Sequence, residues 1–263
     1  MGTAPRSVFD PFGTFDNKGY LENTTAEKDL EKVKRMEHLA FSSRLDQALQ
    51  ILADTEEITY ATVLKTHQTL FQDFYHWAGR DRLSTAPDKE ISKGDINSPL
   101  RTEFERPGQI QLAFDYGLQL SSDQKRMKAK AGTVMGLFAF AHPFLDGNGR
   151  TILLVHMELC FRAGFSIAWA ATQKQAYLEA LSREIDSPYE GFLDTYLQPF
   201  IRPVTDREDW MDQILNIRGL EGASAADAMD DGVYVAGKVD DPEMAERYRA
   251  QAGKRRYRVE PDL

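Results

Sequence analysis

Two strongly apolar stretches flank a short polar loop, and this arrangement constrains the fold more than any other feature of the sequence. Before the loop, residues 124–141 carry apolar side chains at three- and four-residue steps, which is the period of an amphipathic helix. After it, the run Ile152 to Cys160 is almost wholly apolar. The loop, His142-Pro-Phe-Leu-Asp-Gly-Asn-Gly-Arg150, is therefore expected to lie between two buried helices.

The loop holds residue types that suit phosphate chemistry. Gly147 and Gly149 can adopt backbone angles closed to other residues, and the neighbouring N–H groups, at the start of the next helix, would form an anion nest. Arg150 adds a rigid fork of donors, and Asp146 offers an oxygen ligand of the kind that Mg²⁺ accepts. His142 titrates near neutral pH, so we expect it to be a general base. Each of these residues alone would more simply be structural, but together they indicate a site.

These residues resemble the signature of Fic-domain proteins, His-x-Phe-x-Asp/Glu-Gly-Asn-Gly-Arg-x-x-Arg. The segment from His67 to Gly79, followed by Ile91-Ser-Lys-Gly94, is similar to the helix and flap that precede the motif in that family. Tyr20-Leu-Glu-Asn23 resembles the family's usual opening, and the likeness covers roughly residues 10 to 202. The sequence is thus expected to form an all-α, Fic-type helical domain with a small β-hairpin flap and a C-terminal extension.

Most members of that family transfer the AMP part of ATP to a hydroxyl side chain (Ser, Thr or Tyr) of another protein. The resemblance implies a protein adenylyltransferase that uses ATP as co-substrate and Mg²⁺ as cofactor. It implies that His142 takes the proton of the attacking hydroxyl, that Asp146 holds Mg²⁺, and that Phe144 anchors the loop in the core. It also implies that the four residues after Asp146 bind the phosphates of ATP, namely Gly147, Asn148, Gly149 and Arg150. Of these, Arg150 would hold the outer phosphates.

One position departs from the family's pattern. The second arginine of the signature falls at position 153, where this chain has Leu153. In the family that arginine contacts the phosphates of ATP, and a hydrogen bond to a charged group is worth about 1.5–3 kcal/mol. Its absence leaves alternatives open: transfer of UMP or of a phosphoryl group, or a non-catalytic, nucleotide-dependent protein-binding module.

Between residues 80 and 107 the helical period stops, and Gly, Pro, Ser and Asn accumulate. The family places its flap here, and the edge of such a hairpin can accept an extended target segment as an additional strand. We expect Ile91 to clamp the target's modified residue and Lys93 to approach phosphate or the target backbone. The alternative is a mobile surface loop with ordinary polar residues.

Composition restricts the partners. A net charge of −9 and a pI near 5.2 argue against a nucleic-acid-coating role, so a protein is the expected macromolecular partner. The single cysteine, Cys160, lies in an apolar run and is expected to be a small buried hydrophobe. No segment approaches 18 consecutive apolar residues, so no membrane role is expected. A cytoplasmic location is expected, with secretion into a host cell as an alternative, as for bacterial toxin or effector relatives.

The rest of the chain divides into an irregular N-terminal arm (1–23), the Fic-type domain (24–202) and a C-terminal helix and tail (203–263). Residues 59–76 are expected to be helical, with His67 as a hydrogen-bonded core histidine rather than a catalytic one. Capping boxes predict helix starts at Thr24, Thr172, Ser187 and Thr205. In the tail we expect a short strand near 233–236, and a basic cluster at 254–258 that is more simply solvated than docked.

Many Fic proteins are restrained by a helix with the pattern Ser/Thr-x-x-x-Glu-Gly/Asn, whose Glu pairs with the second arginine. The Glu-Asn and Glu-Gly pairs of this chain, at 22–23, 190–191 and 221–222, lack Ser or Thr at the required position. An inhibitor would then be a separate antitoxin-like chain, although Leu153 removes the arginine that its Glu would grip. The protein is therefore expected to be free of this restraint or controlled elsewhere.

Overall fold

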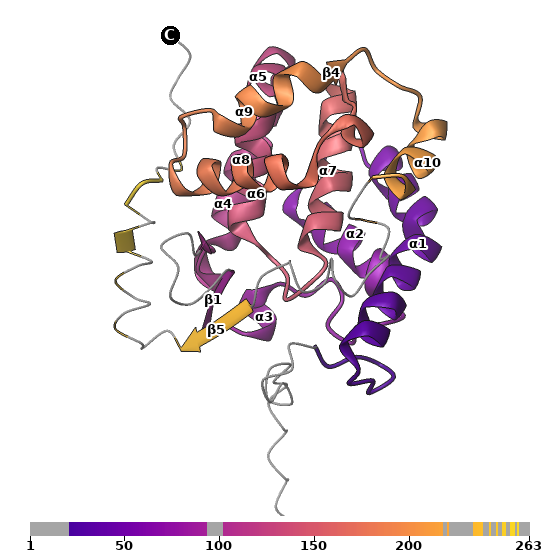
Figure 1. Cartoon of the computed structure of the whole chain (residues 1–263), viewed down its shortest axis with the longest axis vertical. Coiled ribbons are helices and arrows are strands. Elements are labelled where there is room, and N and C mark those ends of the chain that lie inside the picture. Colours follow the sequence, from indigo (N-terminus) through magenta and orange to yellow (C-terminus); the bar gives the residue numbers. More distant parts are fainter. Residues whose placement is uncertain are drawn as a thin grey trace, which may run out of the picture.

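The computed structural model is mainly helical, as expected (Figure 1). It describes residues 21–93 and 102–217, residue 220, the strand at 234–238, and single residues of the C-terminal tail up to 257. Its longer helices are α1 (Leu30–Asp54), α2 (Tyr60–Phe71), α4 (Ile110–Ser121), α6 (Ala131–Ala141), α7 (Asn148–Arg162) and α8 (Lys174–Asp186). Shorter helices are α3 (Arg82–Thr85), α5 (Gln124–Ala129), α9 (Phe192–Leu197) and α10 (Trp210–Leu215). One-turn 3₁₀ segments are η1 (Pro107–Gln109), η2 (Trp169–Ala171), η3 (Gln198–Phe200) and η4 (Arg207–Asp209).

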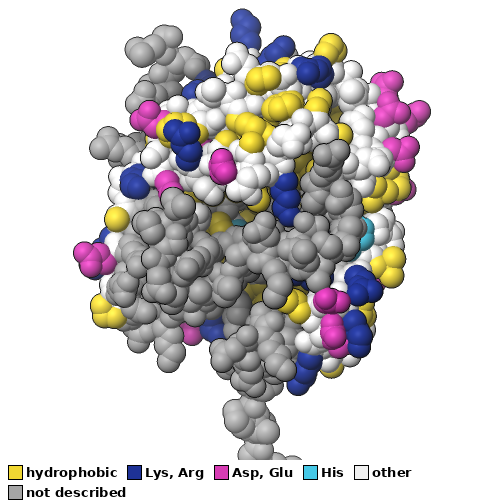
Figure 2. Space-filling model, in the orientation of Figure 1, with side chains coloured by type: hydrophobic (Ala, Val, Ile, Leu, Met, Phe, Trp, Pro, Cys, Tyr) yellow, Lys and Arg dark blue, Asp and Glu magenta, His cyan; other side chains and the backbone are white. Residues whose placement is uncertain are grey.

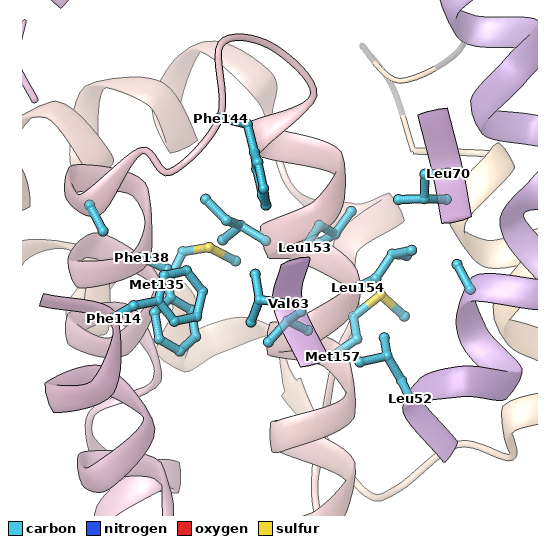
Figure 3. Close-up of a cluster of buried hydrophobic side chains, with 14 of the residues drawn as sticks. Leu52, Val63, Leu70, Phe114, Met135, Phe138, Phe144, Leu153, Leu154 and Met157 are labelled. Atoms are coloured by element: carbon cyan, nitrogen blue, oxygen red, sulfur yellow. The ribbon is translucent and has the colours of Figure 1, made fainter. Parts of the chain in front are cut away.

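The two helices that flank the polar loop form the centre of the domain. Almost every side chain of α6 is buried, because α4, α8 and α9 all pack against this helix. On the other side, α7 packs against α1 and α2, which form a pair. Figure 3 shows apolar side chains from these helices meeting in one cluster, which includes Phe114, Phe138 and Leu154. The apolar runs therefore fix the two ends of the loop in the core.

Several helix starts differ from the expected ones. The first helix, α1, begins at Leu30 and not at Thr24. The Asp29 side chain caps it by accepting the Lys32 N–H. Residues 23–27 form a turn instead, because the Asn23 side chain accepts the N–H groups of residues 25 and 27. The caps expected at Thr172 and Thr205 lie one residue before the observed caps of α8 and η4, and the cap expected at Ser187 lies four residues before that of α9. The helix expected over residues 124–141 is interrupted at Lys130, so this segment forms two helices, α5 and α6.

The flap is present as two strands, β1 (Lys89–Lys93) and β2 (Thr102–Glu103), and the residues that connect them lie outside the described part of the chain. They pair antiparallel, with Ser92 opposite Glu103. A third strand, β5 (Tyr234–Lys238), pairs antiparallel with the other edge of β1, which gives the order β2-β1-β5. In Figure 1, β5 lies beside β1. The strand expected near 233–236 thus exists, and it belongs to the flap.

A second small sheet closes the other end of the domain. Strand β3 (Ser166–Ile167), directly after α7, pairs antiparallel with β4 (Ile201–Arg202). No helix within the described residues is long and apolar enough to cross a membrane. On the face in Figure 2, basic and acidic side chains are interspersed over the described surface.

Arg255 of the basic cluster is packed against the domain, so the expectation of a solvated cluster is wrong for this residue, whereas Lys254 is exposed. Arg255 is buried, with its guanidinium 3.5 Å from the centroid of the Phe140 ring of α6, and it donates to the Ile185 carbonyl. The Tyr257 hydroxyl donates to the Glu105 carboxylate, two residues after β2. The C-terminal tail therefore contacts the helical domain at α6 and beside the flap.

Candidate functional site

The polar loop joins α6 to α7 through two residues with left-handed backbone angles. His142 caps the end of α6 with a φ of 43°, and Gly147 opens α7 with a φ of 73°. At Gly147 a Cβ atom would approach the Phe71 ring to 2.5 Å, so no larger residue fits there. Between them Phe144 is fully buried, and Figure 3 shows it among the core side chains. The loop is thus held at both ends and in its middle, and Phe144 is the core anchor that the resemblance implies.

His67 supports this loop from α2. Its Nδ1 accepts the Gly79 N–H at 2.9 Å, so its proton lies on Nε2, which donates to the Asp146 carbonyl at 3.1 Å. The ring stacks on Phe144, with 3.7 Å between centroids. Burial lowers the pKa of His67 to about 3, so this imidazole stays neutral. The structure confirms the expected hydrogen-bonded core histidine.

The expected base, His142, is bound to the side chain of Asn148. The amide orientation of Asn148 is defined by two bonds, since its Oδ1 accepts the Phe144 N–H and its Nδ2 donates to the Phe144 carbonyl, both at 2.8 Å. The same Nδ2 lies 3.0 Å from Nε2 of His142. An amide nitrogen can only donate, so Nε2 carries the lone pair. The imidazole is therefore in the state that a general base requires.

The start of α7 has backbone donors suited to an anion nest, although the N–H of Gly147 itself donates to the Asp146 side chain. The first helical bond is from the Thr151 N–H to the Gly147 carbonyl, so the N–H groups of residues 148–150 have no acceptor within the helix. They lie at the positive end of a 15-residue helix. Gly149 is exposed, and a Cβ atom there would meet nothing within 4 Å. Open space at this position leaves room for an anion against the main chain.

Arg150, in the first turn of α7, is held between two rings and a carboxylate. Its guanidinium carbon lies 4.9 Å from the centroid of Phe71 and 5.6 Å from that of Phe41. Its Nη2 lies 2.5 Å from Oε1 of Glu37, a residue of α1 that is only 5% exposed. The direction of the guanidinium is therefore fixed by contacts within the protein.

Glu37 is a member of the site that the sequence did not lead us to single out. Burial raises its pKa to about 7, and the nearby charge of Arg150 limits this rise. Burial also raises the pKa of Tyr75 well above its usual range, as do the charge of Glu37 and a hydrogen bond to it. One signal was available: Glu37 lies four residues after Val33 and four before Phe41, on the apolar stripe of α1.

Asp146, the expected Mg²⁺ ligand, directly precedes Gly147, the residue that opens α7. Its Oδ1 accepts the Gly147 N–H at 2.7 Å, while Oδ2 has no hydrogen-bond partner among the described residues. The described residues contain no group of three or more His, Cys, Asp or Glu side chains that could hold a metal ion by themselves. A single carboxylate fits the way Mg²⁺ binds when waters and substrate phosphates supply its other ligands.

Leu153, one turn after Arg150, belongs to the core. It is 7% exposed, and Figure 3 shows it among the buried apolar side chains of the cluster. This position therefore contributes packing and no charge to the site.

The flap reaches the site through Phe104, which directly follows β2. Its ring stacks on that of His142, with 3.8 Å between centroids, and its N–H donates to the Ile91 carbonyl at 3.1 Å. Ile91 lies at the centre of β1 and is only 2% exposed. Lys93 ends β1, and its side chain lies outside the described part of the structure.

Arg82 of α3 is a second residue that sequence reasoning missed. It is fully buried, and its guanidinium donates to the carbonyls of His142 at 2.7 Å, Glu105 at 2.6 Å and Ala141 at 3.3 Å. Its own N–H donates to the Pro143 carbonyl at 2.7 Å. Arg82 thus ties the end of α6 to the flap. No local pattern in the sequence distinguishes it from other arginines.

Cys160 lies outside this site. It is buried in α7, 3.6 Å from Nδ1 of His156, and burial raises the pKa of its thiol well above the usual value. Such a thiol is a poor nucleophile. The structure thus supports the expectation of a small buried side chain.

Comparisons with known proteins agree with this geometry. Residues 57–160 match the model of the Fic/DOC family. Protein adenylyltransferase VbhT of Bartonella schoenbuchensis is 30% identical over 174 residues, which are 65% of this chain and 35% of VbhT. The probable protein adenylyltransferase y4lH of Sinorhizobium fredii is 26% identical over 180 residues, 67% of this chain and 88% of that protein. The chain thus spans about a third of VbhT and most of y4lH.

Solved structures show the same fold. The BepC protein of Bartonella tribocorum, a translocated effector crystallised with bound AMPPNP, has a TM-score of 0.58 and 17% identity. That match covers 72% of this chain and 98% of the BepC chain. The N-terminal Fic domain of an effector of Bartonella sp. AR 15-3 has a TM-score of 0.57 and 12% identity, and covers 73% of this chain and 95% of its own.

Proposed function

Because this chain belongs to the Fic/DOC family, we propose that it transfers AMP from ATP to a hydroxyl side chain of another protein. The observation that carries the proposal is the 3.0 Å contact between Nε2 of His142 and Asn148, at the opening of α7 and beside the nest and Arg150. A base with a lone pair and a phosphate site are adjacent there. The relatives named protein adenylyltransferases support the same class of reaction.

The proposed step is a displacement at phosphorus. The target's hydroxyl oxygen forms a bond to the α-phosphorus of ATP, the bond from that phosphorus to the bridging oxygen breaks, and pyrophosphate leaves. His142 takes the hydroxyl proton on Nε2. Since this lone pair accepts from Asn148 in the structure, the attacking hydroxyl replaces the amide when it binds.

Phosphate binding is proposed for the opening of α7. The N–H groups of Asn148, Gly149 and Arg150 would hold the phosphate under attack, because they have no acceptor within the helix. The guanidinium of Arg150 would bind the outer phosphates. Asp146 would hold Mg²⁺, which neutralises phosphate charge when it is bound.

The flap is proposed to position the target. An extended target segment would pair with β1, so that Ile91 and Lys93 lie beside the residue to be modified. The contact between Phe104 and His142 supports this role, because it joins the flap to the base.

Leu153 favours a second candidate, the transfer of a phosphoryl group or of UMP, because the charge that the family places at this position is absent. Three assays with Mg²⁺ separate the candidates: one with ATP labelled on the α-phosphate, one with ATP labelled on the γ-phosphate, and one with UTP labelled on the α-phosphate. Label on protein from the α-phosphate alone supports AMP transfer. Label from the γ-phosphate alone contradicts it and supports phosphoryl transfer, and label from α-labelled UTP in preference to ATP supports UMP transfer.

A further inference from the structure

The docking edge of the flap already holds a strand of the same chain. β5 pairs with β1 over its whole length, with Ile91 opposite Ala236 and Ser92 opposite Val235. β2 pairs with the other edge. A strand has only two edges, so an extended segment cannot pair with β1 while β5 is in place.

We propose that β5 occupies the edge of β1 at which a target protein would dock, and that an extended segment of the target must displace this strand of the same chain. The identity of the competing strand rests on the proposed function. The pairing of β5 with β1 does not depend on that function, because its register is defined residue by residue, from Lys89 opposite Lys238 to Lys93 opposite Tyr234.

The tail is fastened close to this edge, which favours pairing in cis. After β5 it returns to the body, where Lys254 donates to the Asp186 carbonyl at 2.8 Å and Arg255 lies on Phe140. Tyr257 donates to Glu105, which is next to Phe104 in the sequence. A tethered segment has an effective concentration on the order of millimolar, so a target segment competes at a disadvantage.

The backbone geometry identifies which residues of β5 bond to β1. The Ile91 carbonyl accepts from Phe104 and thus faces β2. Because backbone groups alternate sides along a strand, Glu90 and Ser92 direct theirs toward β5. Their partners are Gly237 and Val235, whose N–H groups therefore face β1, while the N–H of Ala236 faces away.

This alternation supplies a matched pair of variants in the full chain. Val235→Pro removes an N–H that bonds to β1, whereas Ala236→Pro removes one that faces away, where an edge strand tolerates proline. Gly237→Pro is a second disrupting variant. None of these three residues belongs to the proposed catalytic site.

The first readout is amide hydrogen exchange at Glu90 and Ser92, resolved by NMR. We expect Val235→Pro and Gly237→Pro to accelerate exchange at these two amides at least about tenfold, the factor for a strand paired 90% of the time. Ala236→Pro should exchange like the wild type. Equal protection in all four proteins would overturn the assignment of β5 to this edge.

The second readout is binding of a labelled synthetic peptide with the sequence of residues 232–240, followed by fluorescence anisotropy. We expect it to bind Val235→Pro at least about tenfold more tightly than the wild type or Ala236→Pro, since the tail no longer competes. Equal binding to all three proteins, or to none, would overturn the proposal. Neither readout uses nucleotide, so both are independent of whether AMP transfer is observed.

Discussion

Glu37 and Arg150 form a buried ion pair, 2.5 Å between Oε1 and Nη2, that joins α1 to the first turn of α7. The carboxylate fixes one side of a guanidinium that Phe41 and Phe71 also hold. The same pair creates a pH dependence, because burial raises the pKa of Glu37 to about 7. If Arg150 binds phosphate as proposed, this ion pair links stability to phosphate binding.

The first prediction concerns stability against pH. The folded pKa of Glu37 lies above the unfolded one, so between about pH 4.5 and 7 the native chain holds a proton that the unfolded chain has lost. Its contribution is present at low pH and is lost as the pH rises through about 7. From pH 5 to 8 we expect the wild type to lose roughly 2 to 3 kcal/mol relative to Glu37→Gln in urea unfolding.

The control for this prediction is Glu31→Gln, on the exposed face of the same helix, where the side chain is 57% exposed. This variant should follow the wild type at both pH values. A constant difference in unfolding free energy between wild type and Glu37→Gln would contradict the assigned pKa.

The second prediction concerns the outer phosphates. Arg150→Lys keeps the charge but loses the planar fork, so the affinity for ATP should fall about tenfold, as expected for one charged hydrogen bond. AMP lacks the outer phosphates, and its affinity should change little. Calorimetric titrations with both nucleotides test this; an equal loss for AMP would place the guanidinium elsewhere.

The third prediction compares two glycines of the loop. Gly147→Ala should destabilise the fold by at least about 2 kcal/mol, because a left-handed alanine is strained and its Cβ would meet Phe71. Gly149→Ala should leave stability within about 0.5 kcal/mol of the wild type, yet weaken ATP binding by filling the space at the nest. Thermal unfolding and nucleotide titration of both variants separate the two roles. Similar stability loss at both positions would show that the loop is held in another way.

The fourth prediction concerns Arg82. Lysine cannot reach the three carbonyls that this guanidinium binds, so Arg82→Lys should cost about 2 to 4 kcal/mol of stability through unsatisfied buried acceptors. Arg80→Lys, at an exposed neighbour, should stay within about 0.5 kcal/mol. Urea unfolding measures both. An equally small effect at Arg82 would mean that the carbonyls find other partners.

The loop and its flanking helices were predictable, because their signals are local. The apolar runs located α6 and α7, and the motif located the left-handed turn at Gly147 and the anchor Phe144. His67 was also predicted correctly, since a lone histidine on an apolar face is commonly a hydrogen-bonded core residue.

What the sequence did not predict depends on contacts between distant segments. Arg82 is defined by carbonyls 23 to 60 residues away, and no spacing rule connects them. The docking of Arg255 on Phe140 and the pairing of β5 with β1 are long-range in the same way. The error at Thr24 has a local cause: the Asn23 side chain accepts the N–H groups of residues 25 and 27, so the chain turns once more before α1 begins.

The most direct test of the account is the rate of AMP transfer by wild type and His142→Ala, measured with α-phosphate-labelled ATP and with ATP affinity determined in parallel. A positioned base contributes about 10²–10⁴-fold, so the account predicts a loss of that size with ATP affinity within about threefold. Equal transfer rates, with both proteins folded and binding ATP, would contradict the role of His142 and with it the proposed chemistry.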